Sequence, residues 1–282
     1  MKSANQFSCR IKAVITAVYG PLLQRCPPPP NPEERWQKLW RTKLNRPARI
    51  SLAEFNRSAE IALSTFRAAA WERGVIEPVP YWPAVAAGML PELQELKPEK
   101  VVEFLYAHAQ LQRGLRLTPG ADQVLRHLQK SGTYLGLISN GDAFTPMELA
   151  LAFHEPHAPI DPLPLRSSSC DVCEEAEVAR MLEIFTPALC FWAFAAGFGK
   201  PNPHVFQHVH VRLRMRSVAP EETLMVGETE EHDLHPARKF GWKTWRLTGD
   251  NEEAANAGDW QKLAIALGCG AHAERRAESC TT

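Results

Sequence analysis

The second half of the chain alternates between short apolar runs and segments with helical spacing, and this alternation limits the fold more than any other feature. The apolar runs lie at residues 134–138, 187–194, 223–226 and 244–247. The helical segments lie before the first of these runs, at residues 120–130, and between later ones, at residues 203–214 and 235–240. Strands that alternate with helices favour a parallel sheet with helices on both faces. The sequence therefore predicts an α/β fold with a doubly wound parallel sheet.

Residues 11–18 form another apolar, β-rich run, which Gly20-Pro21 ends. A nearly continuous apolar run is typical of a central strand that is covered on both faces. No small-residue cleavage site follows this run, so we expect a buried strand and not a signal peptide. Ligands of such sheets bind at the carboxyl ends of the strands. We therefore look for a site at residues 17–20, 139–140 and 227–228.

A long helical segment separates this first strand from the alternating region. Its apolar residues recur three and four positions apart, and Ser51 followed by Glu54 resembles a capping box. We expect an all-helical domain inserted into an α/β core, with a proline- and serine-rich insertion loop and a flexible tail. The expected boundaries are 24–112 for the helical domain, 1–23 and 113–268 for the core, 154–180 for the loop and 269–282 for the tail.

Composition limits the partners and the location. The chain has 32 basic and 32 acidic side chains without a long run of one sign, which argues against nucleic acid as a partner. It has no run of about 20 apolar residues, so we expect no membrane helix. Its 7 cysteines are scattered and odd in number, unlike a disulfide framework. These features together predict a cytoplasmic protein.

Four short motifs follow one another along the chain. They are Ala-Val-Tyr-Gly-Pro at 17–21, Ile-Ser-Asn-Gly at 138–141, Gly-Lys-Pro-Asn-Pro at 199–203, and Val-Gly-Glu-Thr at 226–229. In this order they resemble the four motifs of the haloacid dehalogenase (HAD) superfamily, over nearly the whole of residues 11–250. The resemblance implies a Rossmann-like core with an inserted helical cap, and the chemistry of a phosphatase or a dehalogenase.

The resemblance also implies roles for particular residues. In the family, an aspartate at the end of the first strand attacks the substrate and forms a covalent intermediate. Ser139, Asn140 and Lys200 match the positions that bind the anionic group and offset its charge. Glu228 and Asp233 match the acids of the fourth motif, which hold Mg²⁺ together with the first motif in intact members.

The first motif departs from the family pattern at three positions. Ala17 stands in place of the nucleophilic aspartate, and Pro21 in place of a threonine. Tyr19 stands where most phosphatases have a second aspartate, as in the dehalogenase-like branch. A methyl group cannot attack phosphorus or carbon, so this alignment excludes the family's covalent route. It also removes much of the oxygen shell that Mg²⁺ needs.

A shifted alignment does not restore the nucleophile. The chain has no aspartate before Asp122 and no glutamate in residues 1–32. Thr16 is adjacent to Ala17, but neighbouring residues of a strand point to opposite faces, so its hydroxyl should face away from the site.

A separate group of metal-ligating residue types falls in the expected insertion loop. His154, His157, Cys170 and Cys173 form an H-x-x-H pair followed by a C-x-x-C pair. Four nitrogen and sulfur ligands at such spacings can form a closed zinc site. The segment between the pairs contains three prolines and no hairpin signal, which favours an incidental arrangement in a loop.

Three functions are therefore open. The first is a catalytically inactive HAD-like protein whose remnant anion site binds a phosphorylated or carboxylated small molecule, or which binds a protein partner. The second is an active phosphatase or 2-haloacid dehalogenase-like enzyme with a non-standard nucleophile. The third is a protein-interaction module built on the Cys/His insert. The sequence favours the first, because the nucleophile position holds an alanine.

Overall fold

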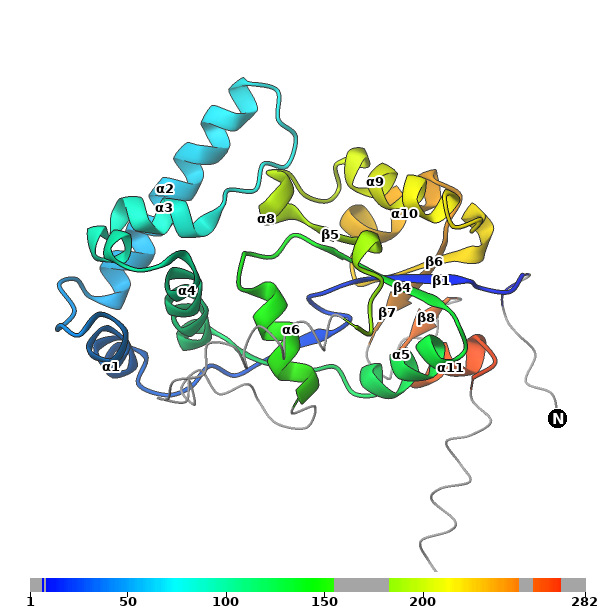
Figure 1. Cartoon of the computed structure of the whole chain (residues 1–282), viewed down its shortest axis with the longest axis horizontal. Coiled ribbons are helices and arrows are strands. Elements are labelled where there is room, and N and C mark those ends of the chain that lie inside the picture. Colours follow the sequence, from blue (N-terminus) through cyan, green and yellow to red (C-terminus); the bar gives the residue numbers. More distant parts are fainter. Residues whose placement is uncertain (1–6, 8, 155–182, 249–255, 270–282) are drawn as a thin grey trace, which may run out of the picture.

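The computed structural model describes residues 7, 9–154, 183–248 and 256–269 (Figure 1). Three residues of the possible zinc site, His157, Cys170 and Cys173, lie outside the described residues. The predicted insertion loop from residue 155 to 180 and the predicted tail after residue 269 also lie outside them. Across the part of the chain that is described, no helix is long and apolar enough to cross a membrane.

The main sheet has six strands, all parallel to their neighbours. Their order across the sheet is β5 (Cys190–Trp192), β4 (Tyr134–Ser139), β1 (Ala13–Ala17), β6 (Thr223–Gly227), β7 (Lys243–Leu247) and β8 (Ala257–Gly258). After β1, the next strands of this sheet along the chain, β4 and β5, lie on one side of β1, and β6, β7 and β8 lie on the other side. The predicted doubly wound α/β sheet is confirmed, with β1 at the point where the strand order reverses.

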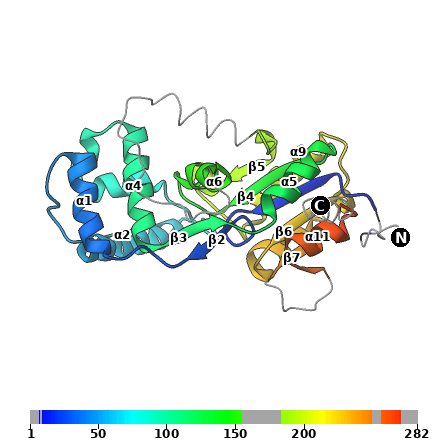
Figure 2. The same cartoon turned by 90° about the horizontal axis from the view of Figure 1, so that it is seen from below.

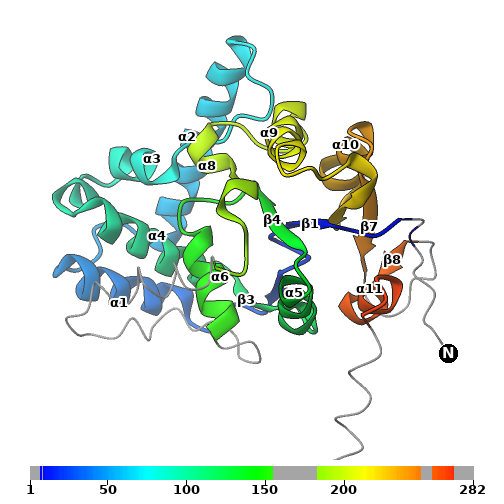
Figure 3. The same ribbon diagram turned by 45° about the vertical axis from the view of Figure 1, so that its right-hand side comes forward.

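Helices cover both faces of the sheet, and the alternation of side chains along β1 explains why (Figure 3). Val14 packs in the apolar cluster shared with α5 (Ala121–Lys130), α6 (Thr145–His154) and α11 (Trp260–Ala266). Ile15 packs in the opposite cluster, shared with α9 (Pro203–Arg214) and α10 (His235–Lys239). β1 is apolar at every position except Thr16, and such a strand can bury the side chains of both its faces only in the middle of such layers.

Short helical turns connect several of these elements. They are η2 (Pro187–Leu189), α8 (Ala193–Ala196), η3 (Pro220–Glu222) and the π-helical turn η4 (Glu230–Leu234). The last of these follows β6 directly and places the fourth-motif acid Asp233 beside the end of that strand.

The helical segment, residues 32–112, lies on one side of the sheet domain (Figure 1). It comprises α1 (Pro32–Leu44), α2 (Leu52–Glu72), α3 (Trp82–Met89), η1 (Pro91–Glu95) and α4 (Pro98–Gln112). The predicted capping box is confirmed at the start of α2, where the Ser51 hydroxyl accepts from the Glu54 amide and the Glu54 carboxylate accepts from the Ser51 amide. The division of the chain into domains stays a prediction.

Two short strands join the helical segment to the sheet, and the sequence did not predict them. β2 (Leu23–Cys26) and β3 (Gly114–Leu117) form an antiparallel pair between the two parts (Figure 2). Each has only four residues, and charged side chains interrupt any alternation, so no periodic signal distinguishes them from linkers. For the same reason β8 was missed, since it has two residues.

An aromatic cluster forms the core of the helical segment and encloses one histidine. The Trp36 ring lies 5.2 Å from that of Phe55, and the His108 ring packs edge-on against both. Only 7% of His108 is exposed, and its Nε2 lies 3.0 Å from the side-chain oxygen of Asn56. Burial lowers the pKa of His108 to about 4, so the imidazole is neutral in the folded protein at neutral pH.

The buried His108 predicts a loss of stability in mild acid. The unfolded chain binds a proton at His108 near its ordinary pKa of about 6.5, whereas the folded protein does not until about 4. Stability is therefore complete above the unfolded pKa and falls as the pH falls towards the folded pKa. From about pH 7 to about pH 5 we expect His108 to account for a loss of about 2 kcal/mol. Urea unfolding at both pH values should show a smaller loss for His108→Gln. Equal losses would contradict this assignment.

Candidate functional site

The register of the sheet brings the motif residues to one edge. Ala17 is paired with Ile138 on β4, so Ser139 lies at the end of the strand beside it. Thr16 is paired with Val226 on β6, so Gly227 lies at the strand end on the other side. The first, second and fourth motifs therefore meet at the carboxyl ends of three adjacent strands, where sheets of this type bind ligands.

The end of β1 presents no nucleophile. Ala17 is 2% exposed, and its methyl belongs to the apolar cluster that also contains Ile15 and Ile138. Thr16 is fully buried, and its hydroxyl donates to the carbonyl of Ala17 at 3.0 Å. The one hydroxyl next to Ala17 on β1 is thus bonded to the backbone.

Lys200 and Asp233 form a buried ion pair at this edge. The Lys200 Nζ lies 2.5 Å from one oxygen of Asp233, with both side chains less than a tenth exposed. The other oxygen accepts from the amides of Glu228 and Thr229 and from the Thr229 hydroxyl, at 3.0–3.1 Å. Burial raises the pKa of Asp233, but Lys200 and the Thr229 donors outweigh burial and hold that pKa below its usual range. The charge of Lys200 is therefore offset within the protein.

The second motif positions the loop that contains Lys200. The Asn140 amide oxygen accepts from the Lys200 backbone N–H at 2.7 Å, and its Nδ2 donates to the Lys200 carbonyl at 2.8 Å. Gly199 has to be a glycine here, because a Cβ would collide with the Asn140 amide. The Ser139 hydroxyl accepts from the Gly141 N–H at 3.0 Å, which leaves its hydrogen for another acceptor. Asn140 thus shapes the site, and Ser139 can still donate into it.

The Glu228 side chain is exposed and lies against Gly20. A Cβ at Gly20 would overlap the Glu228 carboxylate, and the φ of +87° at Gly20 also favours glycine. The turn after β1 and the turn after β6 are therefore packed together at the site edge.

A second polar network, which we call the junction network, lies between the helical segment and the sheet. Its centre is Glu148 of α6, which is fully buried. Glu148 accepts from the Tyr19 hydroxyl at 2.5 Å, from Arg113 at 2.9 Å and from Gln110 of α4 at 2.8 Å. The Arg113 guanidinium also lies 4.9 Å from the centre of the Tyr19 ring, and Thr145 lies within 2.9 Å of the Tyr19 hydroxyl.

The junction network keeps Tyr19 protonated. Burial and then the adjacent Glu148 carboxylate raise the pKa of Tyr19 well above its ordinary value. Burial also raises the pKa of Glu148, against the opposing effect of Arg113. The Tyr19 phenol, at the position of the second aspartate of the family motif, is therefore hydrogen-bonded to α6 and does not titrate near neutral pH.

The loop after α2 is hydrogen-bonded to the loop that contains Lys200. The Gly199 N–H donates to the Glu77 carbonyl at 2.9 Å, and the Val79 N–H donates to the Gly197 carbonyl at 3.0 Å. The Asn202 side chain donates to the Ile76 carbonyl at 3.2 Å. These contacts and the junction network attach the helical segment to the sheet at two places.

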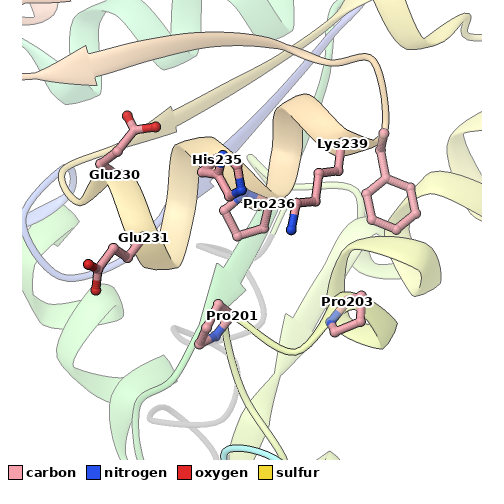
Figure 4. Close-up of a pocket in the computed structure, with 8 residues that line it drawn as sticks. Pro201, Pro203, Glu230, Glu231, His235, Pro236 and Lys239 are labelled. Atoms are coloured by element: carbon pink, nitrogen blue, oxygen red, sulfur yellow. The ribbon is translucent and has the colours of Figure 1, made fainter.

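A surface hollow of about 410 Å³ lies beside the Lys200 loop (Figure 4). Pro201 and Pro203 form one wall, and η4 and α10 form the other, with Glu231 near one end and Lys239 near the other. Neither Ala17, Ser139 nor Lys200 lines it. This hollow is therefore adjacent to the strand-end site and distinct from it.

The family model for haloacid dehalogenase-like hydrolases matches residues 31–241 of the chain. The chain belongs to this family. The match spans the helical segment and the second, third and fourth motifs. No curated protein matches the chain.

Solved structures of HAD proteins resemble the chain at low identity. A HAD phosphatase from Thermococcus onnurineus is 17% identical with a TM-score of 0.49, and the match covers 90% of this chain and 96% of that one. The HAD-hydrolase YfnB from Bacillus subtilis, solved bound to magnesium, is 17% identical with a TM-score of 0.47 and coverage of 92% and 99%. A 2-haloacid dehalogenase from Pseudomonas syringae pv. Tomato DC3000 is 17% identical with a TM-score of 0.48 and coverage of 91% and 98%.

The HAD first- and fourth-motif positions of this chain do not fit a Mg²⁺ ion. Mg²⁺ prefers near-octahedral oxygen coordination that includes carboxylates. Ala17 offers a methyl, the Tyr19 hydroxyl is bound to Glu148, and both Asp233 oxygens are hydrogen-bonded. Glu228 is the carboxylate that is left. Across the described ranges, no three His, Cys, Asp or Glu side chains are grouped so as to hold a metal ion.

The site residues that the sequence predicted, and that lie within the described ranges, are found in the following places. Ala17, Ser139, Asn140, Lys200, Glu228 and Asp233 meet at the strand-end edge. Tyr19 turns to the junction network, and His154 is the last residue of α6. Their roles in binding stay predictions.

Sequence reasoning missed Arg113, Glu148, Thr145 and Gln110. Glu148 gave one usable signal, because it is the single carboxylate in the mainly apolar α6, a helix that the sequence analysis did not predict. A lone acid in an apolar helix needs a buried partner. Which residue supplies that partner depends on tertiary contacts that the local sequence does not encode.

The buried ion pair predicts unequal effects for two variants. Asp233→Asn leaves the Lys200 charge buried without its partner, so we expect a loss of about 3–5 kcal/mol in the free energy of unfolding. The double variant Asp233→Asn with Lys200→Met removes both charges and should be more stable than the single variant. Chemical denaturation measures both. If the two variants unfold at the same denaturant concentration, the unpaired lysine is not the cause of the loss.

Proposed function

We propose that this HAD family member is a pseudoenzyme, a catalytically inactive protein that retains a small-anion site at the carboxyl ends of β1, β4 and β6. The observation behind the proposal is the buried methyl of Ala17 at the position of the family's nucleophile. The fold of the active family is kept, but the atom that would form the covalent intermediate is absent.

Two further features support inactivity. The Tyr19 hydroxyl, at the position of the second aspartate in most phosphatases, is held by Glu148 and Thr145 and stays protonated. The Thr16 hydroxyl, the nearest alternative nucleophile on β1, is buried and bonded to the backbone. An alternative nucleophile would need both exposure and a base partner, and Thr16 has neither.

The proposed anion site rests on Ser139 and Lys200. Ser139 keeps a hydroxyl hydrogen to donate, and Asn140 holds the Lys200 loop beside it. Because Asp233 already offsets the Lys200 charge, we expect only millimolar affinity for a phosphate or carboxylate group, about −4 kcal/mol. The ligand class is a phosphorylated or carboxylated small molecule, and the helical segment is proposed to act as its cap.

Inactivity predicts negligible hydrolysis of p-nitrophenyl phosphate and of 2-haloacids. Steady-state assays of repurified protein, with and without added Mg²⁺, measure this directly. Ser139→Ala and Lys200→Ala serve as controls for a contaminating enzyme, because contamination would be insensitive to both. Turnover that survives repurification and disappears in both variants would refute the proposal and favour an active hydrolase with another nucleophile.

The first motif also predicts the result of a repair experiment. Ala17→Asp alone should give little or no activity, because Pro21 lacks the backbone N–H that an anion-binding turn would use. One missing donor of this kind typically costs about 10²–10³ in rate. Ala17→Asp with Pro21→Thr should therefore be the more active variant. Ala17→Asp should also lower stability, because it places a carboxylate among buried apolar side chains. If the single variant turns over as fast as the double, Pro21 has no part in the loss.

A further inference from the structure

The second half of α2 has few contacts with the rest of the molecule. The buried residues near its start are Leu52, Phe55 and Ala59, and from residue 60 to residue 69 no side chain is buried. In two views the end of the helix projects beyond the neighbouring elements (Figures 1 and 3). A helix of this length without a packed face is marginal in water, because most helical stability in proteins comes from tertiary packing.

Large apolar side chains are exposed on this projecting part. Trp71 is 77% exposed and Ile61 is 61% exposed, and Ile76 and Tyr81 of the following loop are 56% and 47% exposed. Large exposed apolar side chains often mark interaction surfaces, and tryptophan is among the residues enriched in them.

One stripe along a face of α2 carries an acidic residue near one end and a basic residue near the other, so two copies of this stripe in antiparallel orientation have complementary charges. Glu60, Ser64, Arg67 and Trp71 are spaced four, three and four residues apart, so they lie on one face, and all four are exposed. Glu60 and Arg67 are two helical turns apart, too far to pair with each other on the same helix. Neither forms an ion pair within the described residues.

We propose that this stripe is the interface of a homodimer in which two α2 helices pack antiparallel. A two-fold axis beside residues 63 and 64 places Glu60 opposite the partner's Arg67, and by symmetry Arg67 opposite the partner's Glu60. The small side chain of Ser64 near the axis lets the helices approach closely. Trp71 then lies over the first turns of the partner helix, which removes a large apolar side chain that is 77% exposed in the monomer from water.

Charge reversal tests the dimer and its register together. Sedimentation equilibrium over a roughly hundredfold range of micromolar concentrations should show a monomer–dimer equilibrium for the wild type. Arg67→Glu and Glu60→Arg each place like charges opposite one another twice, so each should weaken dimerisation by at least about tenfold. The double variant Glu60→Arg with Arg67→Glu restores both pairs and should dimerise nearly as well as the wild type.

A matched control keeps the test specific. Arg41→Glu makes the same change in net charge on α1, at an exposed residue outside the stripe, and should leave the dimer unchanged. All the substituted side chains are exposed, so we expect each variant to fold. Circular dichroism checks that it does. Trp71→Ser should also weaken the dimer. A wild type that is monomeric throughout, as it would be if the stripe binds a different protein, overturns the proposal. A double variant as weak as the single ones overturns it too.

Discussion

The backbone of β1 is hydrogen-bonded on both sides, to β4 and to β6, and all five of its side chains are buried. The strands on both sides of the sheet, and the helices that pack on them, are positioned through β1, because β4 and β5 lie on one side of it and β6, β7 and β8 on the other. The same position makes the end of β1 the natural place for a catalytic group. Ala17 occupies that end, and its methyl packs with Ile15 in the apolar core. In the alignment with the HAD motifs, this is the position of the family's nucleophile.

Lys200 at the strand-end edge and Tyr19 beside it are both bound to acidic side chains of the protein. In the alignment with the HAD motifs, Lys200 would face an aspartate at position 17, and its charge is instead offset by Asp233. Tyr19 is held by Glu148, whose charge is offset by Arg113. A buried charge without a partner costs several kcal/mol, so the pairing of Lys200 with Asp233 and of Glu148 with Arg113 stabilises the fold. Under the proposed function, the same pairing lowers the affinity of the strand-end site for anions.

The sequence predicted the elements that have a strong period and missed those that do not. The capping box at Ser51, the helix over 203–214 and the strands at both sides of β1 were found, because apolar spacing and caps are local signals. The strands β2 and β3 are too short for a period, so they were missed. At the strand-end edge, the ordered motifs predicted Ser139 and Lys200, whose binding roles stay predictions. The junction network could not be predicted, since it joins Tyr19, Arg113 and Glu148 from three separate segments.

The hydrogen bonds between the loop after α2 and the loop that contains Lys200 have a thermodynamic consequence. Glu77 and Gly199 are joined through their backbones, so neither loop can shift without breaking or carrying along the other. Two events that each favour one arrangement of these loops then share a coupling free energy, and the coupling is reciprocal. For a ligand of the proposed strand-end site, anything that holds the end of α2 in place would change its affinity by some factor, and the bound ligand would change the strength of contacts at α2 by the same factor.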